Sequence, residues 1–291
     1  MRSDDGGGSA PNYAGSRLEF RLKQPTEGRV TTVKTIADFL NEFAPLDLAE
    51  DWDNVGLLLG SDTAGVKKVL TCLTLTEDVA DEAVSDGFQL IVSHHPILFK
   101  KVQRLTNRTI EGRMLLKLLH AGIAVYSPHT SYDSAGAGIN QQLAECLGLK
   151  EIGPIRELET DSDSGSGRLG STKTKMSQAD LVQHVKASLG LDQLQFVSGD
   201  GRDISKVGVA CGSAAEFLRD AERKGCDALV TGEARFHSLL EARSRGVALI
   251  LLGHYSSERP AMEHMAEVIA KKFPKLNVQP STAESDPLEW A

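Results

Sequence analysis

The sequence lacks the features that would place the chain among disulfide-rich or membrane-spanning proteins. Only four of its 291 residues are cysteines, and no two of them form a Cys-x-x-Cys pair. We therefore expect reduced thiols, as in a cytoplasmic protein. No apolar stretch approaches the ~18 residues that a membrane-spanning helix needs, so the sequence predicts a soluble protein without a membrane partner.

A positive charge balance is also missing. The chain has 32 Lys and Arg residues against 40 Asp and Glu residues, a formal net charge of −8. This balance disfavours a general binder of phosphate backbones, so a nucleic-acid partner is not expected. The first residues, beginning "MRSDDGGGSA", mix acids with bases and contain no apolar core of a signal peptide. Residues 1–31 are predicted to be a disordered N-terminal tail.

Strand-like and helix-like segments alternate through most of the remaining chain. In residues 32–150, "VLTCLTL", "FQLIV" and "IAVYS" are typical of strands, and amphipathic helical patterns separate them. The same pattern returns in residues 204–275 with "VGVAC", "DALVTGE" and "VALILLGH". This alternation predicts an α/β fold with two similar halves, each around a largely parallel sheet.

The segment between the two halves, residues 151–203, has a different composition. It is polar and rich in Gly and Ser, with one amphipathic helix for which Ser177 is a plausible N-cap. Its "GSGRLG" (165–170) matches the dinucleotide-binding pattern GxGxxG, but no apolar strand precedes it and no helix opens on it. We therefore expect a flexible or substrate-covering loop there. Residues 276–291 are interpreted as a C-terminal tail.

The two halves are predicted to be an internal repeat. Cys72 precedes His94 by 22 positions, and Cys211 precedes Glu233 by the same 22 positions. Each half then continues through a helix and a Gly into one more strand. The first half ends in "HTSYD" and the second in "HYSSE", so similar polar groups follow equivalent strands.

These polar groups are the candidate functional residues. Ligand sites of open α/β sheets lie outside the carboxyl ends of the strands, and two facing halves would pool their groups in one cleft. Imidazoles with carboxylates suit Zn²⁺, Mn²⁺, Fe²⁺ or Ni²⁺. Seven such groups exceed the need of one ion, so two divalent ions per subunit are the more economical prediction. The groups are His94, His95, His129, Asp133, Glu233, His254 and Glu258.

Each group also has a simpler interpretation. Adjacent histidines occur on ordinary polar loops, and Glu258 could only complement the dipole of a helix whose N-cap is Ser257. The joint position of the groups, each just past an apolar strand, favours a site. His237 starts a helix and could reach the cleft. Three further histidines lie within helical patterns and are interpreted as packing or surface residues: His120, His184 and His264.

The sequence also resembles a known family, the Ngg-one-interacting-factor-three-like proteins, often labelled GTP cyclohydrolase I type 2 homologues. The resemblance runs from about residue 32 to 273 and rests on "WDNVGLLLG", "IVSHHPILF", "HTSYD", "GSGRLG", "VTGEARFH" and "GHYSSE" in this order. It implies a dinuclear metal centre in a cleft between two similar α/β domains, and homohexameric rings. The implied metal ligands are His94, His95, Asp133, His254 and Glu258, with His129 and Glu233 as catalytic or orienting neighbours.

One departure from the family concerns the first strand. Thr74 and Thr76 stand where relatives often carry an Asp-Val-Thr pattern, and this puts a secondary contact near the cleft in question.

We expect a metal-dependent hydrolase in which a metal-bridging hydroxide attacks an unknown small-molecule substrate. Glu233 or His129 would be the general acid or base. Opening of a GTP ring is implied by the family label alone. The competing hypothesis is a non-enzymatic metal-binding regulatory or metal-handling protein, a ring-shaped scaffold.

Overall fold

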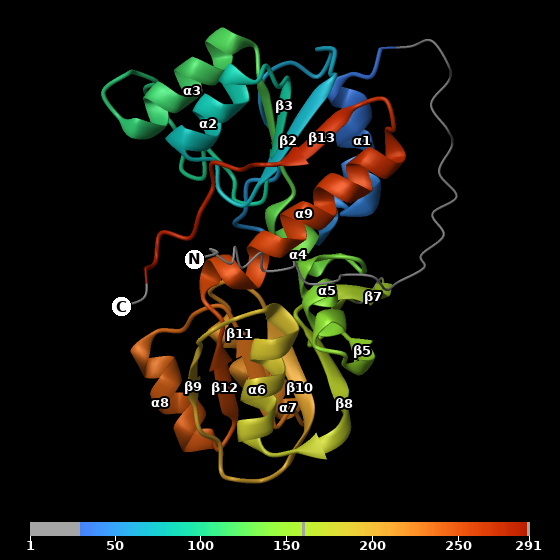
Figure 1. Ribbon diagram of the computed structural model, residues 1–291, viewed down its shortest axis with the longest axis vertical. Helices are drawn as coiled ribbons and strands as arrows, with labels where there is room; N and C mark the ends of the chain where they lie inside the picture. Colours follow the sequence, from blue (N-terminus) through green and yellow to red (C-terminus); the bar gives the residue numbers. More distant parts are fainter. Residues whose placement is uncertain (1–29, 159–160, 290–291) are drawn as a thin grey trace, which may run out of the picture. The chain divides into compact units, whose positions relative to one another are not determined.

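The computed structural model describes residues 30–158 and 161–289. The chain forms two compact units. The terminal unit contains described residues 30–139 and 258–289, and the central unit contains the described residues between 140 and 257. The predicted disordered tail, residues 1–31, lies almost wholly outside the described residues. Each unit is a mixed α/β structure, as the sequence predicts (Figure 1).

The terminal unit is built on a sheet of order β1-β4-β3-β2-β13 in the described residues. The adjacent strands β4, β3, β2 and β13 pair in parallel, and β1 pairs antiparallel to β4. The helices α2 and α3 lie on one face, and α1 lies on the other (Figure 1). The elements are α1 (Val33–Phe43), η1 (Leu46–Leu48), β1 (Gly56–Leu59), β2 (Lys68–Cys72), α2 (Glu77–Ser85), β3 (Leu90–Ser93), α3 (Ile110–Ala121), β4 (Ala124–Ser127), α4 (His129–Ser134) and β13 (Asn277–Pro280).

The three middle strands of this sheet are covered on both faces. Every residue of β3 and β4 is buried, as is all of β2 except Lys68. A parallel sheet covered by helices on both faces is expected to have such continuous apolar strands. Because the strands are short and buried, the polar residues that follow them mark the edge of the sheet where a site can form.

The central unit is built on a sheet of order β5-β8-β10-β11-β12-β9 in the part of the chain that the structure describes. The strands β10, β11 and β12 are parallel, and the strands beyond them on both sides are antiparallel. A separate hairpin pairs β6 with β7. The elements are β5 (Lys150–Gly153), β6 (Arg156–Leu158), β7 (Asp161–Ser166), β8 (Arg168–Met176), α6 (Gln178–Leu189), β9 (Gln195–Val197), β10 (Ile204–Ala210), η2 (Ala215–Phe217), α7 (Leu218–Arg223), β11 (Ala228–Thr231), α8 (Phe236–Arg245) and β12 (Ala248–Leu251).

Two helices cross the division of the chain into units. The helix α5 (Ile139–Cys146) begins at the end of the terminal unit, and α9 (His254–Lys272) leaves the central unit after Ser257. The predicted second half, residues 204–275, therefore spans both units. A single helix, α9, with Pro260 inside it, runs through the point where the chain returns to the first sheet.

The strand registers agree with the predicted repeat. Val69 pairs with Leu90 in the terminal unit, and Gly208 pairs with Leu229 in the central unit. The partners are 21 positions apart in each pair, and both residues of the second pair lie 139 positions after those of the first. This agreement supports the internal repeat, which stays a prediction together with the metal cleft between its halves.

The "GSGRLG" segment corrects the sequence analysis, because it belongs to β7 and β8 and not to a flexible loop. Arg168 is fully buried, and its guanidinium donates to the backbone oxygens of Gly165 and Gly167 at 2.6 and 2.8 Å and to Gln141 Oε1 at 3.0 Å. A charged side chain can be buried when it donates hydrogen bonds to backbone acceptors, so a charged residue does not by itself indicate a solvent-exposed loop. Polar composition alone therefore misled the prediction here.

The described part of the predicted C-terminal tail, residues 276–289, contains a strand of the sheet. Its β13 pairs in parallel with β2, and the following Glu284 accepts from the backbone of Leu73 and Thr74. As an edge strand, β13 is only half buried and ends in Pro280. Edge strands tolerate proline and need no continuous apolar run, so their sequence signal is weak.

The segment 151–203 contains its one predicted helix, α6, but also the strands β6, β7, β8 and β9, which the sequence analysis does not predict. Ser177 caps α6 by accepting from the backbone N–H of Asp180, and the segment 98–109 is a loop before α3. The four cysteines carry free thiols, three of them buried. Among the described residues, none of the helices combines the length and apolarity needed to cross a bilayer.

Candidate metal centre

The candidate site of the terminal unit begins at the carboxyl end of β3. The ladder between β2 and β3 continues past the strand, because the N–H groups of His94 and His95 donate to Cys72 O and Leu73 O at 2.9 and 2.8 Å. Ser127 Oγ donates to His94 O at 2.6 Å. The backbone of both histidines is therefore fixed by the sheet, which directs their side chains beyond its edge.

A third imidazole comes from the end of the neighbouring strand β4. His129 follows Pro128 and begins α4 with a positive φ of 29°, a conformation that only a surrounding network holds in place. Donor atoms of His94, His95 and His129 all lie within 4.8 Å of one another. Three imidazoles thus converge at the end of two parallel strands.

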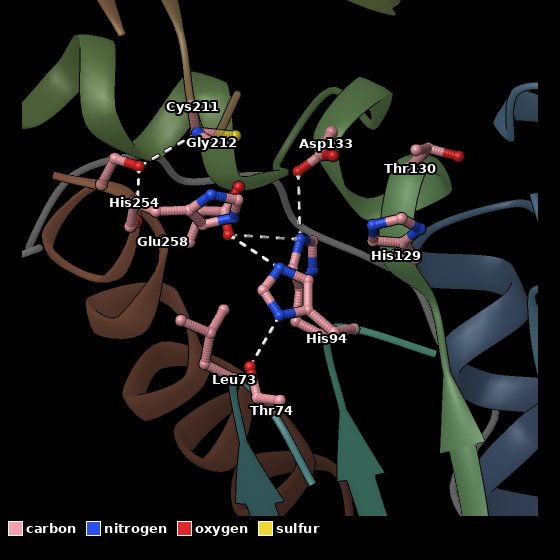
Figure 2. A network of polar contacts seen from close by, with 12 residues as sticks. Leu73, Thr74, His94, His129, Thr130, Asp133, Cys211, Gly212, His254 and Glu258 are labelled. Carbon is pink, nitrogen blue, oxygen red and sulfur yellow. Dashed lines mark hydrogen bonds and ion pairs between the residues drawn. The ribbon is translucent and has the colours of Figure 1, made fainter. Parts of the chain in front are cut away.

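Two carboxylates complete this group. His94 Nε2 lies 3.6 Å from an oxygen of Asp133 (Figure 2). His95 Nε2 lies 3.1 Å from an oxygen of Glu258. Glu258 is also 4.0 Å from His94 Nε2. His94 is fully buried and Glu258 is 4% exposed. Buried groups of this kind are held in proteins by pairing or by metal coordination.

Two contacts orient the rings. Thr74 Oγ1 lies 2.7 Å from His95 Nδ1, and both oxygens of Asp53 lie within 2.8 Å of His129 Nδ1. Each contact occupies Nδ1 and leaves Nε2 of the same ring as the nitrogen that can coordinate a metal ion. Metal-binding histidines commonly hold their second nitrogen in this way. Thr74 therefore supplies a secondary contact of the kind that its departure from the family pattern had put in question.

Asp53 is the functional residue that the sequence analysis missed. It also accepts from the backbone N–H of Asn54 and Thr130 at 2.7 and 3.1 Å and from the Thr130 hydroxyl. Burial alone would raise the pKa of its carboxyl, but the hydrogen bonds from His129 and Thr130 outweigh burial and hold it at about 2. The only sequence signal was its place inside "WDNVGLLLG", where it read as part of an acidic turn.

The electrostatics of His129 follow from the same pair. Burial would lower the pKa of this imidazole, but the hydrogen bond to Asp53 and the nearby charges of Asp133, Asp53 and Glu258 raise it. An imidazole held by a carboxylate on Nδ1 can carry a proton on Nε2, and this is the arrangement of a general acid or base.

The central unit holds the other two predicted site residues. Glu233 follows β11, and its carboxylate lies 3.1 Å from Nδ1 of His254. The side chains are 56% and 35% exposed. His254 begins α9 one helical turn before Glu258, so the two residues lie on the same face of that helix.

Three of the remaining histidines, His120, His184 and His264, were interpreted as packing or surface residues, whereas His237 was expected to be able to reach the cleft. His237 is exposed in the first turn of α8, and His120 is exposed in the last turn of α3. His184 Nε2 contacts Leu147 O at 2.8 Å. Burial lowers the pKa of His264 within α9.

The donor set of the terminal unit fits a divalent metal. It offers imidazole nitrogens and carboxylate oxygens, which is the ligand chemistry of Zn²⁺, Mn²⁺, Fe²⁺ and Ni²⁺. Two of its rings are oriented through Nδ1, and its most buried members lie beside carboxylates. The His and Glu cluster could therefore hold a metal ion.

Comparison with known proteins gives a consistent answer. The model of the family Duf34/NIF3 (NGG1p interacting factor 3) matches residues 31–287. A Clostridium perfringens protein named GTP cyclohydrolase 1 type 2 homolog is 32% identical over 82% of this chain and 91% of its own. A Schizosaccharomyces pombe protein named NIF3 homolog is 35% identical over 83% and 91%. A crystal structure of a Staphylococcus aureus protein, 27% identical, has a TM-score of 0.82 over 90% of this chain and 99% of its own.

Proposed function

Because the chain belongs to the Duf34/NIF3 family, we propose that it binds divalent metal ions at the terminal unit and acts as a metal-dependent hydrolase. The observation that carries this proposal is the convergence of three imidazoles and two carboxylates at the ends of β3 and β4. A site built only for stability would not be expected to gather so many metal-ligand side chains in one place.

The proposed ligands are His94, His95, Asp133, Glu258 and His254. The first four belong to the terminal unit and contact one another there. His254 joins them in the proposal because it precedes Glu258 by one turn of α9 and its Nδ1 is held by Glu233. Five ligands of this kind exceed the needs of one ion, which supports two ions per subunit.

When bound, divalent ions supply Lewis acidity that lowers the pKa of a coordinated water towards neutrality. The chain contributes the proton transfers. Asp53 fixes Nδ1 of His129, so Nε2 is the atom that accepts or returns a proton. Glu233 is the second candidate, since it is exposed and could act directly or through His254.

The substrate is proposed only as a small molecule with an electrophilic carbon or phosphorus. Several relatives are named GTP cyclohydrolase 1 type 2 homologs, so GTP belongs in the first screen. A homohexameric ring and a cytoplasmic location stay predictions of the family resemblance.

The decisive experiment is the metal content per subunit, measured by plasma mass spectrometry for the native chain and for His95→Ala, Asp133→Ala and Glu258→Ala. We expect about two ions in the native protein and fewer in each variant. His184→Ala is the matched control, since this histidine lies on α6 away from the proposed ligands and should leave the metal content unchanged. Native protein without metal after anaerobic reconstitution would refute the ligand assignment.

Turnover separates the enzyme from a metal-handling protein. The metal-loaded chain should hydrolyse a phosphoester, nucleotide or amide in a broad screen, and His129→Gln should reduce the rate while retaining metal. A catalytic centre keeps an exchangeable water, whereas a structural centre is closed by protein ligands. Metal bound at full occupancy with no exchangeable water would favour the non-enzymatic alternative.

A further inference from the structure

We propose that Trp52 and Phe99 form an aromatic rim that binds a planar aromatic or heteroaromatic ring of the substrate. This inference rests on the proposed function, because it assigns a substrate class to the same site. Trp52 is 61% exposed and Phe99 is 52% exposed. Their ring centroids lie 5.9 Å apart at an interplanar angle of 68°. Two adjacent aromatic rings in water are a surface that gains free energy by binding an apolar, flat partner.

The rim is connected to the candidate metal centre through ring contacts. The Trp52 ring lies 6.1 Å from the His129 ring, and the His129 ring lies 5.1 Å from the buried His94 ring. Rings thus continue from the solvent-exposed indole to the ligand cluster within the terminal unit. A flat group stacked on Trp52 would have its ring bonds, or bonds directly attached to the ring, beside His129.

The rim is also fixed in position before any ligand arrives. Asn54 Nδ2 donates to Leu98 O at 3.0 Å and to Ile97 O at 3.4 Å, which ties the segment of Trp52 to the segment of Phe99. Leu98 has a φ of 56°, a region that a branched side chain rarely occupies and that costs free energy. Such strain beside an exposed aromatic pair is typical of a binding site.

The segment that contains Asn54 also contacts the pair formed by Asp53 and His129. The backbone N–H of Asn54 donates to Asp53 at 2.7 Å, and Asp53 holds His129. One short segment therefore presents Trp52 on one side and orients the proposed proton carrier on the other. Trp52, Asp53 and Asn54 are consecutive in the chain, so the position of the aromatic rim is fixed relative to His129. A surface patch for a second copy of this chain would not need that link to the site.

The test compares two probes that differ only in the ring. Purine nucleoside monophosphates (AMP and GMP) carry a flat heterocycle, and ribose 5-phosphate has the same sugar phosphate without it. Trp290→Phe leaves Trp52 as the single tryptophan, so quenching of its fluorescence by the purine probes reports on stacking. Calorimetry gives the dissociation constants of all three probes with the Zn²⁺-loaded protein.

We expect the purine probes to bind more tightly than ribose 5-phosphate and to quench Trp52. Trp52→Ala should weaken purine binding by roughly 5- to 150-fold, the range found for stacking of a base on an aromatic side chain, and Trp52→Phe should retain most of it. Phe196→Ala, which removes a half-exposed aromatic ring from β9 of the central unit, is the matched control and should have no effect. Thermal unfolding of each variant checks its fold.

Equal affinity for purine and ribose probes, absence of purine binding, or a Trp52→Ala variant with unchanged purine affinity would each overturn the inference. A lower oligomeric mass of Trp52→Ala with unchanged purine affinity would identify the rim as a subunit contact. The proposed function is judged separately, by metal content and hydrolysis in the same samples. Metal and turnover without ring preference refute only the rim, and ring preference without metal refutes only the hydrolase.

Discussion

Both units are built around buried parallel strands but place their buried polar groups differently. In the terminal unit the fully buried His94 lies at the end of the sheet, among other ligand-type side chains. In the central unit the largest buried polar side chain is Arg168, which donates to the backbone of its own strands. One unit therefore uses a buried polar group to build a site, and the other uses it to hold the sheet together.

The strand ends differ accordingly. β3 of the terminal unit is followed by two histidines with little exposure, whereas β11 of the central unit is followed by Gly232 and the exposed Glu233. Gly232 lies so close to Gly212 O that a Cβ atom there would be only 2.6 Å away. By the 139-position offset of the two registers, Gly232 corresponds to Ser93, and the exposed Glu233 corresponds to the buried His94. The comparison teaches that a polar side chain just past a buried parallel strand can be buried in one unit and exposed in the other.

The largest expected effect is on the central unit, from Arg168→Met. The change retains much of the apolar volume but removes the donor of three backbone carbonyls, those of Asp163, Gly165 and Gly167. The buried acceptors that this change leaves unsatisfied together cost about 3–5 kcal/mol of the free energy of unfolding. Urea unfolding measures the loss, and hydrogen exchange should place it in β8.

The matched control for this change is Arg202→Met. Arg202 pairs with Asp200 on the surface, and its side chain is 60% exposed. Pairs of this kind contribute about 0–1 kcal/mol. A loss for Arg168→Met no larger than that for Arg202→Met would contradict a structural role for the buried guanidinium.

The second prediction compares ligands from the two units. His94→Ala should weaken metal binding on the order of 10²–10³-fold, since a bound Zn²⁺ contributes about 10–16 kcal/mol shared among its ligands. His254→Ala should weaken it less, by about 10-fold, because this side chain is a third exposed and already paired with Glu233. Competition with a chelator measures both affinities, and His120→Ala from the surface of α3 is the control. An equal loss in both variants would show that burial does not set the rank of the ligands.

The third prediction concerns Asp53, which orients one ring of the site. Asp53→Asn keeps the shape but weakens the hold on His129 Nδ1, so metal affinity or turnover should fall about 10- to 100-fold. Asp53→Ala should be at least as damaging, and Asp51→Asn on the neighbouring exposed acid is the control. Retained activity in Asp53→Asn would refute the orienting role.

The same pair gives a pH dependence in the metal-free protein. The folded pKa of Asp53, about 2, lies below its ordinary value of 3.8, so its contribution to stability is present above 3.8 and is lost as the pH falls towards 2. The pKa of His129 is raised above 6.5, so its contribution is present below 6.5 and is lost as the pH rises through the folded value. The stability difference between native protein and Asp53→Asn should therefore be largest between about pH 4 and 6.5. A difference that grows steadily above pH 7 would contradict this assignment.

The sequence was sufficient for the buried strands and for the convergence of the three imidazoles of the terminal unit. β2, β3 and β4 are short apolar runs bounded by glycine-ended helices, and the groups just past them include His94, His95 and His129. Short, fully apolar strands that alternate with helices are typical of a parallel sheet covered on both faces. The carboxyl ends of neighbouring strands then lie side by side. This is why counting positions along the chain was enough to bring the imidazoles of the terminal unit together.

The sequence was not sufficient where a polar segment is stabilised by one distant partner. Arg168 turns a Gly- and Ser-rich stretch into two strands, and Asp53 enters the site through a contact with a histidine 76 positions away. Hydrogen bonds of this kind depend on where the fold brings the partner, and no periodic pattern signals them. The sequence analysis also missed that the chain returns to the terminal unit within α9, because one helix belongs to both units.

The smallest expected effect concerns how the terminal unit is closed. Unlike the central unit, it combines two separate stretches of chain, and Glu82 on α2 ties the second to the first. Its carboxylate accepts from Thr282 N and Thr282 Oγ1 at 2.9 and 2.8 Å and also from the Ser281 hydroxyl. Glu82→Gln should cost about 1–2 kcal/mol, because an amide cannot accept all of these donors. Asp81→Asn, the adjacent exposed acid paired with Lys117, should cost less than about 1 kcal/mol.

The pH dependence of this variant completes the prediction. Burial would raise the pKa of Glu82, but the hydrogen bonds from Ser281, Thr282 and Ala283 lower it below 4.5. The stabilisation is therefore present above 4.5 and is lost as the pH falls through the folded value. Native protein and Glu82→Gln should converge in stability at low pH, whereas Arg168→Met should stay destabilised because the backbone oxygens and the Gln141 amide that Arg168 contacts do not titrate. Urea unfolding from pH 7 to 3 measures the difference in free energy of unfolding between native protein and Glu82→Gln. A difference that stays constant with pH would mean that the carboxylate charge does not hold the C-terminal segment in place.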